Sequence, residues 1–203
     1  MTPFVRGPVG WVEVICGPMF SGKSEELIRR VRRTQIARQR VQVFKPLIDD
    51  RYSEDEIVSH SALRIPAMNV RTAREILEGV EARTQVVGID EAHFYDDEIP
   101  NVVESLADMG KRVIVAGLDL DYLGQPFDHV TRILAQAEEI TKSLAICVRC
   151  GNPASRTQRL VASEERIVVG GARAYEARCR QCFEPRLGQA ELPLEDRARV
   201  ARP

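Results

Sequence analysis

The chain has 203 residues, of which 44% are hydrophobic and 29% charged, and its formal net charge is −1. This balance argues against the broad basic surface that nonspecific nucleic-acid binding requires. No apolar run reaches the roughly 20 residues that span a bilayer, and the first residues lack the apolar core of a secretory signal. We therefore expect a cytoplasmic protein with one sizeable core and a small appended module, and with neither nucleic acid nor membrane as partner.

The first motif follows an apolar run, Trp11 to Cys16, which predicts a buried strand. Residues 17–24 then read Gly-Pro-Met-Phe-Ser-Gly-Lys-Ser, the pattern of a phosphate-binding loop. Its glycines allow tight turns, so that successive N–H groups can face a polyphosphate, while the lysine reaches the outer phosphates and the last serine ligates Mg²⁺. The predicted nucleotide contacts here are Gly17, Pro18, Met19, Phe20, Ser21, Gly22, Lys23 and Ser24.

A helix is predicted to begin near Ser24, because Leu27, Ile28, Val31 and Thr34 recur at helical spacing. The N-terminal dipole of this helix adds to the anion site. Before the loop, Cys16 is interpreted as a small buried hydrophobe rather than a reactive thiol.

The next segments are weaker in pattern. Val41 to Phe44 predicts a second strand, Lys45 to about Ile65 a long mobile loop, and Thr72 to Leu77 a short helix. Gln85 to Asp90 predicts a third strand that ends in an acid. Asp90 and the residues that follow it, Glu91, Ala92 and His93, complete the predicted nucleotide contacts.

These acids are the natural partners of a phosphate-binding loop. Asp90 would hold Mg²⁺ together with Ser24, and Glu91 would accept the proton of an attacking hydroxyl or water. Two classes of protein fit: a DEAH-like, nucleic-acid-stimulated ATPase, in which Glu91 activates water, and a small-molecule kinase. The single nucleotide-binding lobe and the near-neutral charge argue against the first class.

Helices and strands alternate through the rest of this region. Ile99 to Leu106 predicts a helix that Gly110 ends, 112–116 a fourth strand, 129–137 a helix, and the alternation from Ile140 to Ile146 a fifth strand. The pattern predicts an α/β fold of the P-loop NTPase type, with a mostly parallel sheet, helices on both faces and the ligand at the carboxyl ends of the strands.

Four of the five cysteines form two Cys-x-x-Cys pairs, Cys147 with Cys150 and Cys179 with Cys182. This spacing predicts a structural zinc site of four thiolates, although a redox Cys-x-x-Cys pair is the rival interpretation. Between the pairs, residues 157–160 and 167–175 suggest a β-hairpin or looped ribbon, in which Gly170 and Gly171 allow close backbone approach to a ligand.

We therefore divide the chain into a nucleotide-binding domain over 1–146, a zinc-binding β module that carries a lasso loop over 147–186, and a disordered tail over 187–203.

The motifs together resemble the zinc-containing thymidine kinases, P-loop kinases of deoxynucleosides. The resemblance runs from about Trp11 to Phe183 and includes the loop at 17–24, Phe44-Lys-Pro, Asp50-Arg-Tyr, Asp90-Glu-Ala-His-Phe, Gly117-Leu-Asp-Leu-Asp-Tyr, Gln125-Pro-Phe, the paired cysteines and Tyr175-Glu-Ala-Arg-Cys. It implies transfer of the γ-phosphate of ATP to the 5′-hydroxyl of thymidine and deoxyuridine, with Glu91 as base and Ser24 and Asp90 as the Mg²⁺ ligands.

The resemblance also implies a nucleoside pocket, a lasso that closes over the base, a homotetramer and feedback inhibition by thymidine triphosphate. The pocket positions are Met19, Phe94, Leu118, Tyr122, Phe127, Thr157, Val169, Gly170, Gly171 and Tyr175. Two departures from the family pattern are Ser61-Ala62, where an acidic residue and glycine are frequent, and His93, where many relatives carry glutamine. His93 could therefore add a pH-sensitive contact near Glu91.

Overall fold

A six-stranded sheet carries the nucleotide-binding half of the protein. The computed structural model describes residues 9–48, 56–58, 64–161 and 170–185. The strand order is β5-β2-β6-β7-β1-β8, and every pair of neighbours is parallel. The strands are β1 (Trp11–Cys16), β2 (Val41–Pro46), β5 (Met68–Val70), β6 (Val86–Ile89), β7 (Arg112–Gly117) and β8 (Glu139–Lys142).

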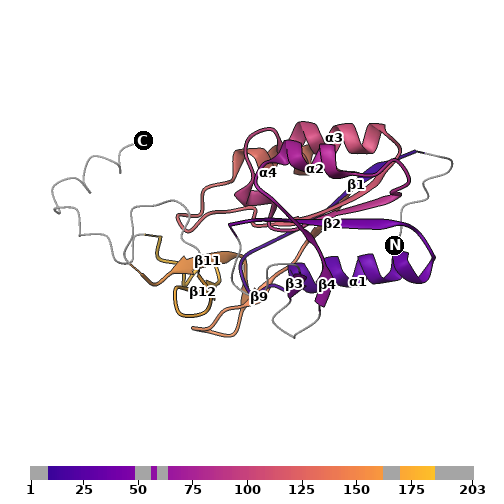
Figure 1. Ribbon diagram of the computed structural model, residues 1–203. Helices are drawn as coiled ribbons and strands as arrows, with labels where there is room; N and C mark the ends of the chain where they lie inside the picture. The colour runs from indigo at the N-terminus through magenta and orange to yellow at the C-terminus, as the bar shows by residue number, and fades with distance from the viewer. Residues whose placement is uncertain (1–8, 49–55, 59–63, 162–169, 186–203) are drawn as a thin grey trace.

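Helices cover both faces of this sheet (Figure 1). One face carries α1 (Lys23–Ile36), and the other carries α2 (Ala73–Gly79), α3 (Ile99–Asp108) and α4 (Asp128–Gln136). Because successive strand residues point to opposite faces, β1 supplies Val14 to the core under α3 and Ile15 to the core under α1. The predicted α/β architecture of the P-loop NTPase type is confirmed.

A small antiparallel hairpin lies where we predicted a long loop. It consists of β3 (Glu56–Val58) and β4 (Arg64–Pro66), and Ile57 and Ile65 are each 3% exposed in the core under α1. The sequence around these residues is polar and shows no strand period, which is why it predicted a loop. The hairpin forms because it buries these two apolar side chains. Asp50-Arg-Tyr and Ser61-Ala62, which the sequence analysis singled out, lie outside the described residues.

The predicted fifth strand is two strands. β8 ends at Lys142, and β9 (Ala145–Ile146) instead pairs with β10 (Pro153–Ala154) in a separate two-stranded sheet. At the break, the Ser143 N–H donates to the Cys16 carbonyl at 2.8 Å. The chain turns here, beside the phosphate-binding loop. The sequence did not predict this turn, because polar and apolar residues alternate through it without interruption.

The cysteine module adds a second ribbon, β11 (Arg156–Arg159) paired antiparallel with β12 (Tyr175–Arg178). The predicted β-pairing between the two cysteine pairs is confirmed for residues 157–159 and Tyr175, and Gly171 to Ala174 form a turn immediately before β12. Ile167, where the second predicted segment starts, lies outside the described residues. Val169 and the predicted tail over 187–203 lie outside the described residues. Within the part of the chain that the structure describes, no helix has the length and apolarity to cross a bilayer.

Candidate active site

The loop at residues 17–24 joins β1 to α1, and its backbone demands glycine. Gly17 has a φ of 138° and Gly22 a φ of 78°, both in the region that side chains avoid. A Cβ at Gly17 would also lie 2.2 Å from the Ser143 carbonyl oxygen. The loop therefore rests directly against the chain that leaves β8.

Lys23 and Ser21 close this loop onto itself. The Lys23 ammonium, on a residue only 8% exposed, donates to the Pro18 carbonyl at 2.8 Å, and the Ser21 hydroxyl donates to the same oxygen at 2.8 Å. Lys23 is also the first residue of α1, so a cation and a helix N-terminus share one position. Such a position binds anions through the helix dipole, the free N–H groups and the ammonium together.

The two predicted acids follow β6, beside the start of α1. Asp90 is 4% exposed, and its Oδ1 accepts the Glu91 N–H at 3.0 Å and the Ser24 hydroxyl at 3.4 Å. The facing oxygens of Ser24 and Asp90 form the kind of hard-oxygen pair that Mg²⁺ prefers. The structure thus brings together residues that are 66 positions apart in the sequence.

Glu91 adopts a left-handed backbone conformation, with a φ of 48°. This conformation is unfavourable for a residue with a Cβ and clusters at functional sites in proteins. It marks the turn from β6 into the short 3₁₀ helix η1 (Ala92–Phe94), and it leaves the Glu91 side chain 14% exposed. A carboxylate at the surface of this edge can exchange a proton with a bound ligand.

His93 lies beside Glu91 and beside two aromatic residues of the predicted pocket. Its Nδ1 accepts the Leu118 N–H at 3.2 Å and lies 3.6 Å from Glu91 Oε2. Because Nδ1 is an acceptor in this geometry, the ring's proton is assigned to Nε2. The imidazole ring centroid lies 4.2 Å from that of Phe94 and 5.3 Å from that of Phe127.

A second group of predicted pocket residues lies on the cysteine module. Thr157 Oγ1 accepts the N–H of Met19, which belongs to the phosphate-binding loop, at 3.0 Å. Tyr175 is 6% exposed, and the Gly171 carbonyl accepts its N–H at 3.1 Å. A Cβ on Gly170 would come within 2.9 Å of the Ala174 Cβ, which favours glycine there.

Arg159 is a residue that the sequence analysis missed. Its guanidinium carbon lies 3.5 Å from the centroid of the Tyr122 ring, and its Nη2 donates to the Tyr175 hydroxyl at 3.3 Å. The cation therefore links two predicted pocket tyrosines from different parts of the chain. The only signal in the sequence is an arginine on the same short strand as Thr157, which does not by itself indicate a site.

The four paired cysteines form one cluster. Their sulfur atoms all lie within 4.8 Å of one another, and Cys150 Sγ lies 3.6 Å from Cys179 Sγ. Tetrahedral zinc with Zn–S bonds of about 2.3 Å places its sulfurs about 3.8 Å apart, so the cluster fits this ion. All the described cysteines are free thiols in the structure. The fifth, Cys16, is buried, and burial raises the pKa of its thiol, as expected for an unreactive core residue.

The thiols of this cluster differ in acidity. Hydrogen bonding to the backbone, first to Cys179, lowers the pKa of Cys147 to about 6. Side-chain contacts with Cys150 and Cys179 raise the pKa of Cys182 to about 12. The first thiolate therefore forms readily and the last does not, unless a cation offsets the accumulated negative charge.

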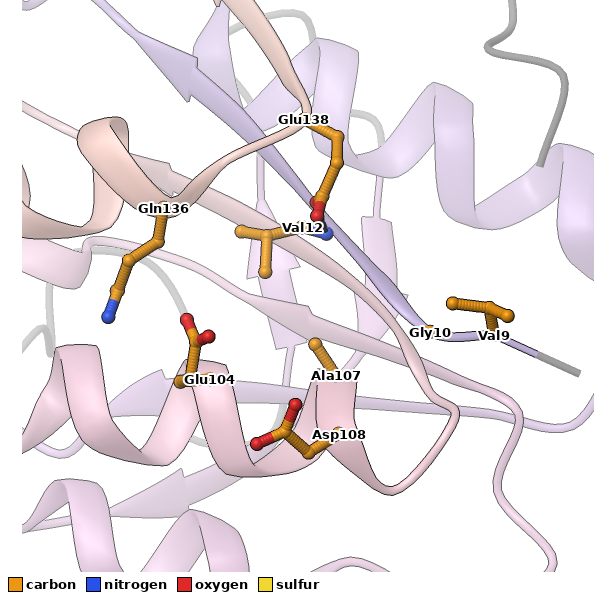
Figure 2. A pocket seen from close by; sticks show the side chains of 8 residues that line it. All are labelled: Val9, Gly10, Val12, Glu104, Ala107, Asp108, Gln136 and Glu138. Atoms are coloured by element: carbon orange, nitrogen blue, oxygen red, sulfur yellow. Dashed lines mark hydrogen bonds between the residues drawn. The ribbon is translucent and has the colours of Figure 1, made fainter.

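A cavity of about 410 Å³ lies at the opposite end of the sheet, beside the start of β1 (Figure 2). Its polar lining consists of Glu104, Asp108, Gln136 and Glu138. A polyphosphate would meet carboxylates there, and the loop at 17–24 does not contribute to it. This cavity is therefore distinct from the candidate active site.

Among solved structures, the chain is similar to a genome packaging NTPase, B204 from Sulfolobus turreted icosahedral virus 2, which was solved in complex with ATP-gammaS. The two share 16% sequence identity, with a TM-score of 0.43. The similarity covers 71% of this chain and 77% of the viral one. Such a likeness is too loose to indicate function.

The sequence comparison is far more specific. The thymidine kinase family model matches residues 10–183, a range that includes the phosphate-binding loop, both acids after β6 and all four clustered cysteines. The chain belongs to the thymidine kinase family.

Proposed function

We propose that this protein transfers the γ-phosphate of ATP to the 5′-hydroxyl of thymidine, and also of deoxyuridine, to supply nucleotide salvage and DNA synthesis. The observation that carries the proposal is the hydrogen bond from the Met19 N–H to Thr157 Oγ1. It joins the loop for the phosphate donor to the module for the nucleoside, so that donor and acceptor would meet at one edge of the sheet.

The donor side would use the loop from Gly17 to Ser24, with its backbone N–H groups around the triphosphate. Lys23 would exchange its bond to the Pro18 carbonyl for the outer phosphates. Ser24 and Asp90 would hold Mg²⁺, which neutralises charge on the β- and γ-phosphates when bound. Ala92 and His93 would complete the nucleotide contacts.

The chemical step assigns one residue a catalytic role. Glu91 would accept the proton of the 5′-hydroxyl while the bond from O5′ to the γ-phosphorus forms and the bond to the β-phosphate oxygen breaks, which releases ADP. The left-handed backbone at Glu91 sets the direction in which its side chain leaves the chain, and His93 lies beside its carboxylate. Such positioning matters because phosphoryl transfer depends chiefly on alignment and charge stabilisation.

The acceptor side would hold the deoxynucleoside between aromatic side chains of the sheet edge and the lasso. The pocket would comprise Met19, Phe94, Leu118, Tyr122, Phe127, Thr157, Val169, Gly170, Gly171 and Tyr175. Lasso backbone groups would read O2, N3–H and O4 of the base. Cytosine presents a donor where thymine presents an acceptor, so deoxycytidine should be a poor substrate.

A nucleic-acid-stimulated ATPase of the DEAH type is not favoured, because the family match spans the loop and the cysteine module together. The zinc would be structural, since four thiolates leave no open position on the metal. The resemblance further leads us to propose a cytoplasmic homotetramer that thymidine triphosphate inhibits, with neither nucleic acid nor membrane as partner.

The test is incubation of the purified protein with Mg-ATP and thymidine, deoxyuridine, deoxycytidine or single-stranded RNA, followed by chromatography of the nucleotides. We expect thymidine monophosphate and ADP in equal amounts, and their loss in Glu91→Gln. Glu104→Gln, the same change on the exposed side of α3, is the matched control and should keep full activity. ADP released only with RNA would contradict the proposal and support the ATPase.

A further inference from the structure

Phe20 is a residue of the phosphate-binding loop whose side chain packs into the cysteine module. The core of the module consists of Ala145, Cys147, Ala154, Ala177 and Cys179, and the Phe20 side chain is half-buried against it. Its backbone has a φ of 66°, a conformation that a residue with a Cβ adopts only where its surroundings enforce it. The packing against the module is one contact that holds this residue in place.

Two further contacts tie the same loop to the module. The Met19 N–H donates to Thr157 Oγ1 on β11 at 3.0 Å. Gly17 lies against the Ser143 carbonyl, two residues before β9. Residues 17, 19 and 20 of the loop thus contact the cysteine module or the segment that leads into it.

We infer that Phe20 is a positioning residue through which the metal-bound module holds the phosphate-binding loop in its binding conformation. The metal would then strengthen the binding of the triphosphate as well as that of the nucleoside. This inference rests on the proposed role of the loop as the triphosphate site, and on no particular nucleoside substrate. The side chain acts without touching phosphate, because the loop contacts phosphate through its backbone.

Thermodynamic linkage makes this coupling measurable from either side. If bound metal raises the affinity of the triphosphate by some factor, bound triphosphate must raise the affinity of the metal by the same factor. Couplings between protein sites are typically about 5- to 150-fold. Phe20→Ala removes the apolar contact and leaves every N–H donor of the loop, so it should abolish most of the coupling. Phe20→Leu keeps an apolar side chain and should restore it.

The experiment uses the zinc-loaded full chain and a chromogenic chelator that competes for zinc at equilibrium. Zinc affinity is measured with and without Mg²⁺ and a non-hydrolysable ATP analogue, and the affinity for that analogue is then measured before and after zinc removal. In the wild type we expect each ligand to raise the affinity of the other by the same factor, of about 5-fold or more. Val148→Ala, on an exposed knuckle residue, is the matched control and should leave the coupling intact.

Independent binding of zinc and the analogue to the wild type would overturn the inference, whatever the variants do. Full coupling in Phe20→Ala would overturn the role of Phe20. If Phe20→Ala does not fold, Phe20→Val, which shortens the side chain but keeps it apolar, replaces it and should also weaken the coupling; full coupling in Phe20→Val would then overturn the role of Phe20. A protein that shows the coupling but phosphorylates no thymidine would contradict the proposed function alone, while an active kinase without the coupling would contradict only this inference.

Discussion

The sheet and the cysteine module are stabilised in different ways. Both faces of the sheet bury large aliphatic side chains, with Leu106, Val103 and Ile133 on one face and Leu27 and Ile28 on the other. The buried cluster of the module contains only alanine and cysteine side chains, with Phe20 and Cys182 partly buried against it. Since stabilisation by apolar burial scales with the area removed from water, this core contributes little. The module must therefore rely on polar contacts and, as we propose, on zinc bound by its four cysteines.

Inside the module, buried polar side chains take the place that aliphatic side chains hold in the sheet. Arg178 is fully buried, its Nε lies 2.6 Å from a Glu176 carboxylate oxygen, and its Nη1 donates to the Cys182 carbonyl at 3.0 Å. The Gln158 amide, 1% exposed, exchanges two hydrogen bonds of 2.8 Å with the Glu184 backbone. Such contacts specify one arrangement more than they stabilise it, because charges lose their hydration when buried. The candidate active site lies where these two kinds of structure meet.

Metal removal should produce the largest difference between the two regions. Structural zinc contributes about 10–16 kcal/mol of folding free energy in small zinc modules, far more than this core can supply. Chelation, or Cys179→Ser, should therefore abolish hydrogen-exchange protection over Tyr175–Arg178 and leave the amides of β1 and β7 protected. Exchange measured by mass spectrometry on apo and zinc-loaded protein checks this. Retained protection of β12 without metal would show that the module folds without its metal.

The next largest effect concerns catalysis rather than folding. Glu91→Gln should lower kcat for thymidine by about 10²- to 10⁴-fold, the usual contribution of a general base. The dissociation constants of thymidine and of the ATP analogue should change little, because the amide keeps the shape of the carboxylate. Stopped-time product assays and equilibrium titrations separate the two quantities. A variant with normal kcat and weakened thymidine binding would instead show that Glu91 serves recognition.

Features that depend on single residues were predictable from the sequence. Glycine is required at Gly17, where a Cβ would collide with the Ser143 carbonyl oxygen, and is favoured at Gly22 by its positive φ. Only cysteine presents the sulfurs of the cluster, so the loop and the four thiols could be located directly. The acid after β6 follows from the loop, since the two occur together in P-loop proteins.

Features set by distant contacts were not predictable. The hairpin of β3 and β4 depends on Ile57 and Ile65 reaching the core under α1, and the break after β8 depends on Ser143 bonding to Cys16. The contact between Met19 and Thr157 spans 138 positions. The roles of the individual pocket residues remain predictions, as does the pH sensitivity of His93, which an unshifted pH–rate profile in His93→Gln would contradict.

A truncation in the sheet core should have a smaller effect than either change above. Leu106 on α3 is fully buried in the larger apolar cluster, so Leu106→Ala should lower the free energy of unfolding by about 2–5 kcal/mol. Val148→Ala in the module should change it by no more than about 0.5 kcal/mol, because that side chain is 60% exposed. Urea denaturation of the zinc-loaded proteins measures both. Equal losses would contradict the view that apolar burial stabilises the sheet and not the module.

The smallest effect expected is a pH dependence that arises within the sheet. Burial by itself would raise the pKa of Glu13 on β1, but hydrogen bonding and the charge of Arg112, with further bonds from Trp11 and Arg30, lower it overall from the ordinary 4.5. Arg112 lies 2.6 Å from this carboxylate, and so does Arg30 of α1. A carboxylate with a lowered pKa in the folded state stabilises the fold above its ordinary pKa.

That stabilisation should be complete above about pH 4.5 and should decline as the pH falls toward and through the lowered pKa of folded Glu13. Urea midpoints of the zinc-loaded protein, measured at steps below pH 5, should therefore fall more steeply in the wild type than in Glu13→Gln. Glu104→Gln, an exposed carboxylate, should keep the wild-type slope.

Because metal release in acid would also unfold the module, tryptophan fluorescence is the suitable signal. Trp11, the only tryptophan, lies on β1 and donates to Glu13 at 2.8 Å, so it reports on the sheet alone. Parallel slopes in the wild type and Glu13→Gln would show that Glu13 and its arginine partners do not cause the loss of stability in acid.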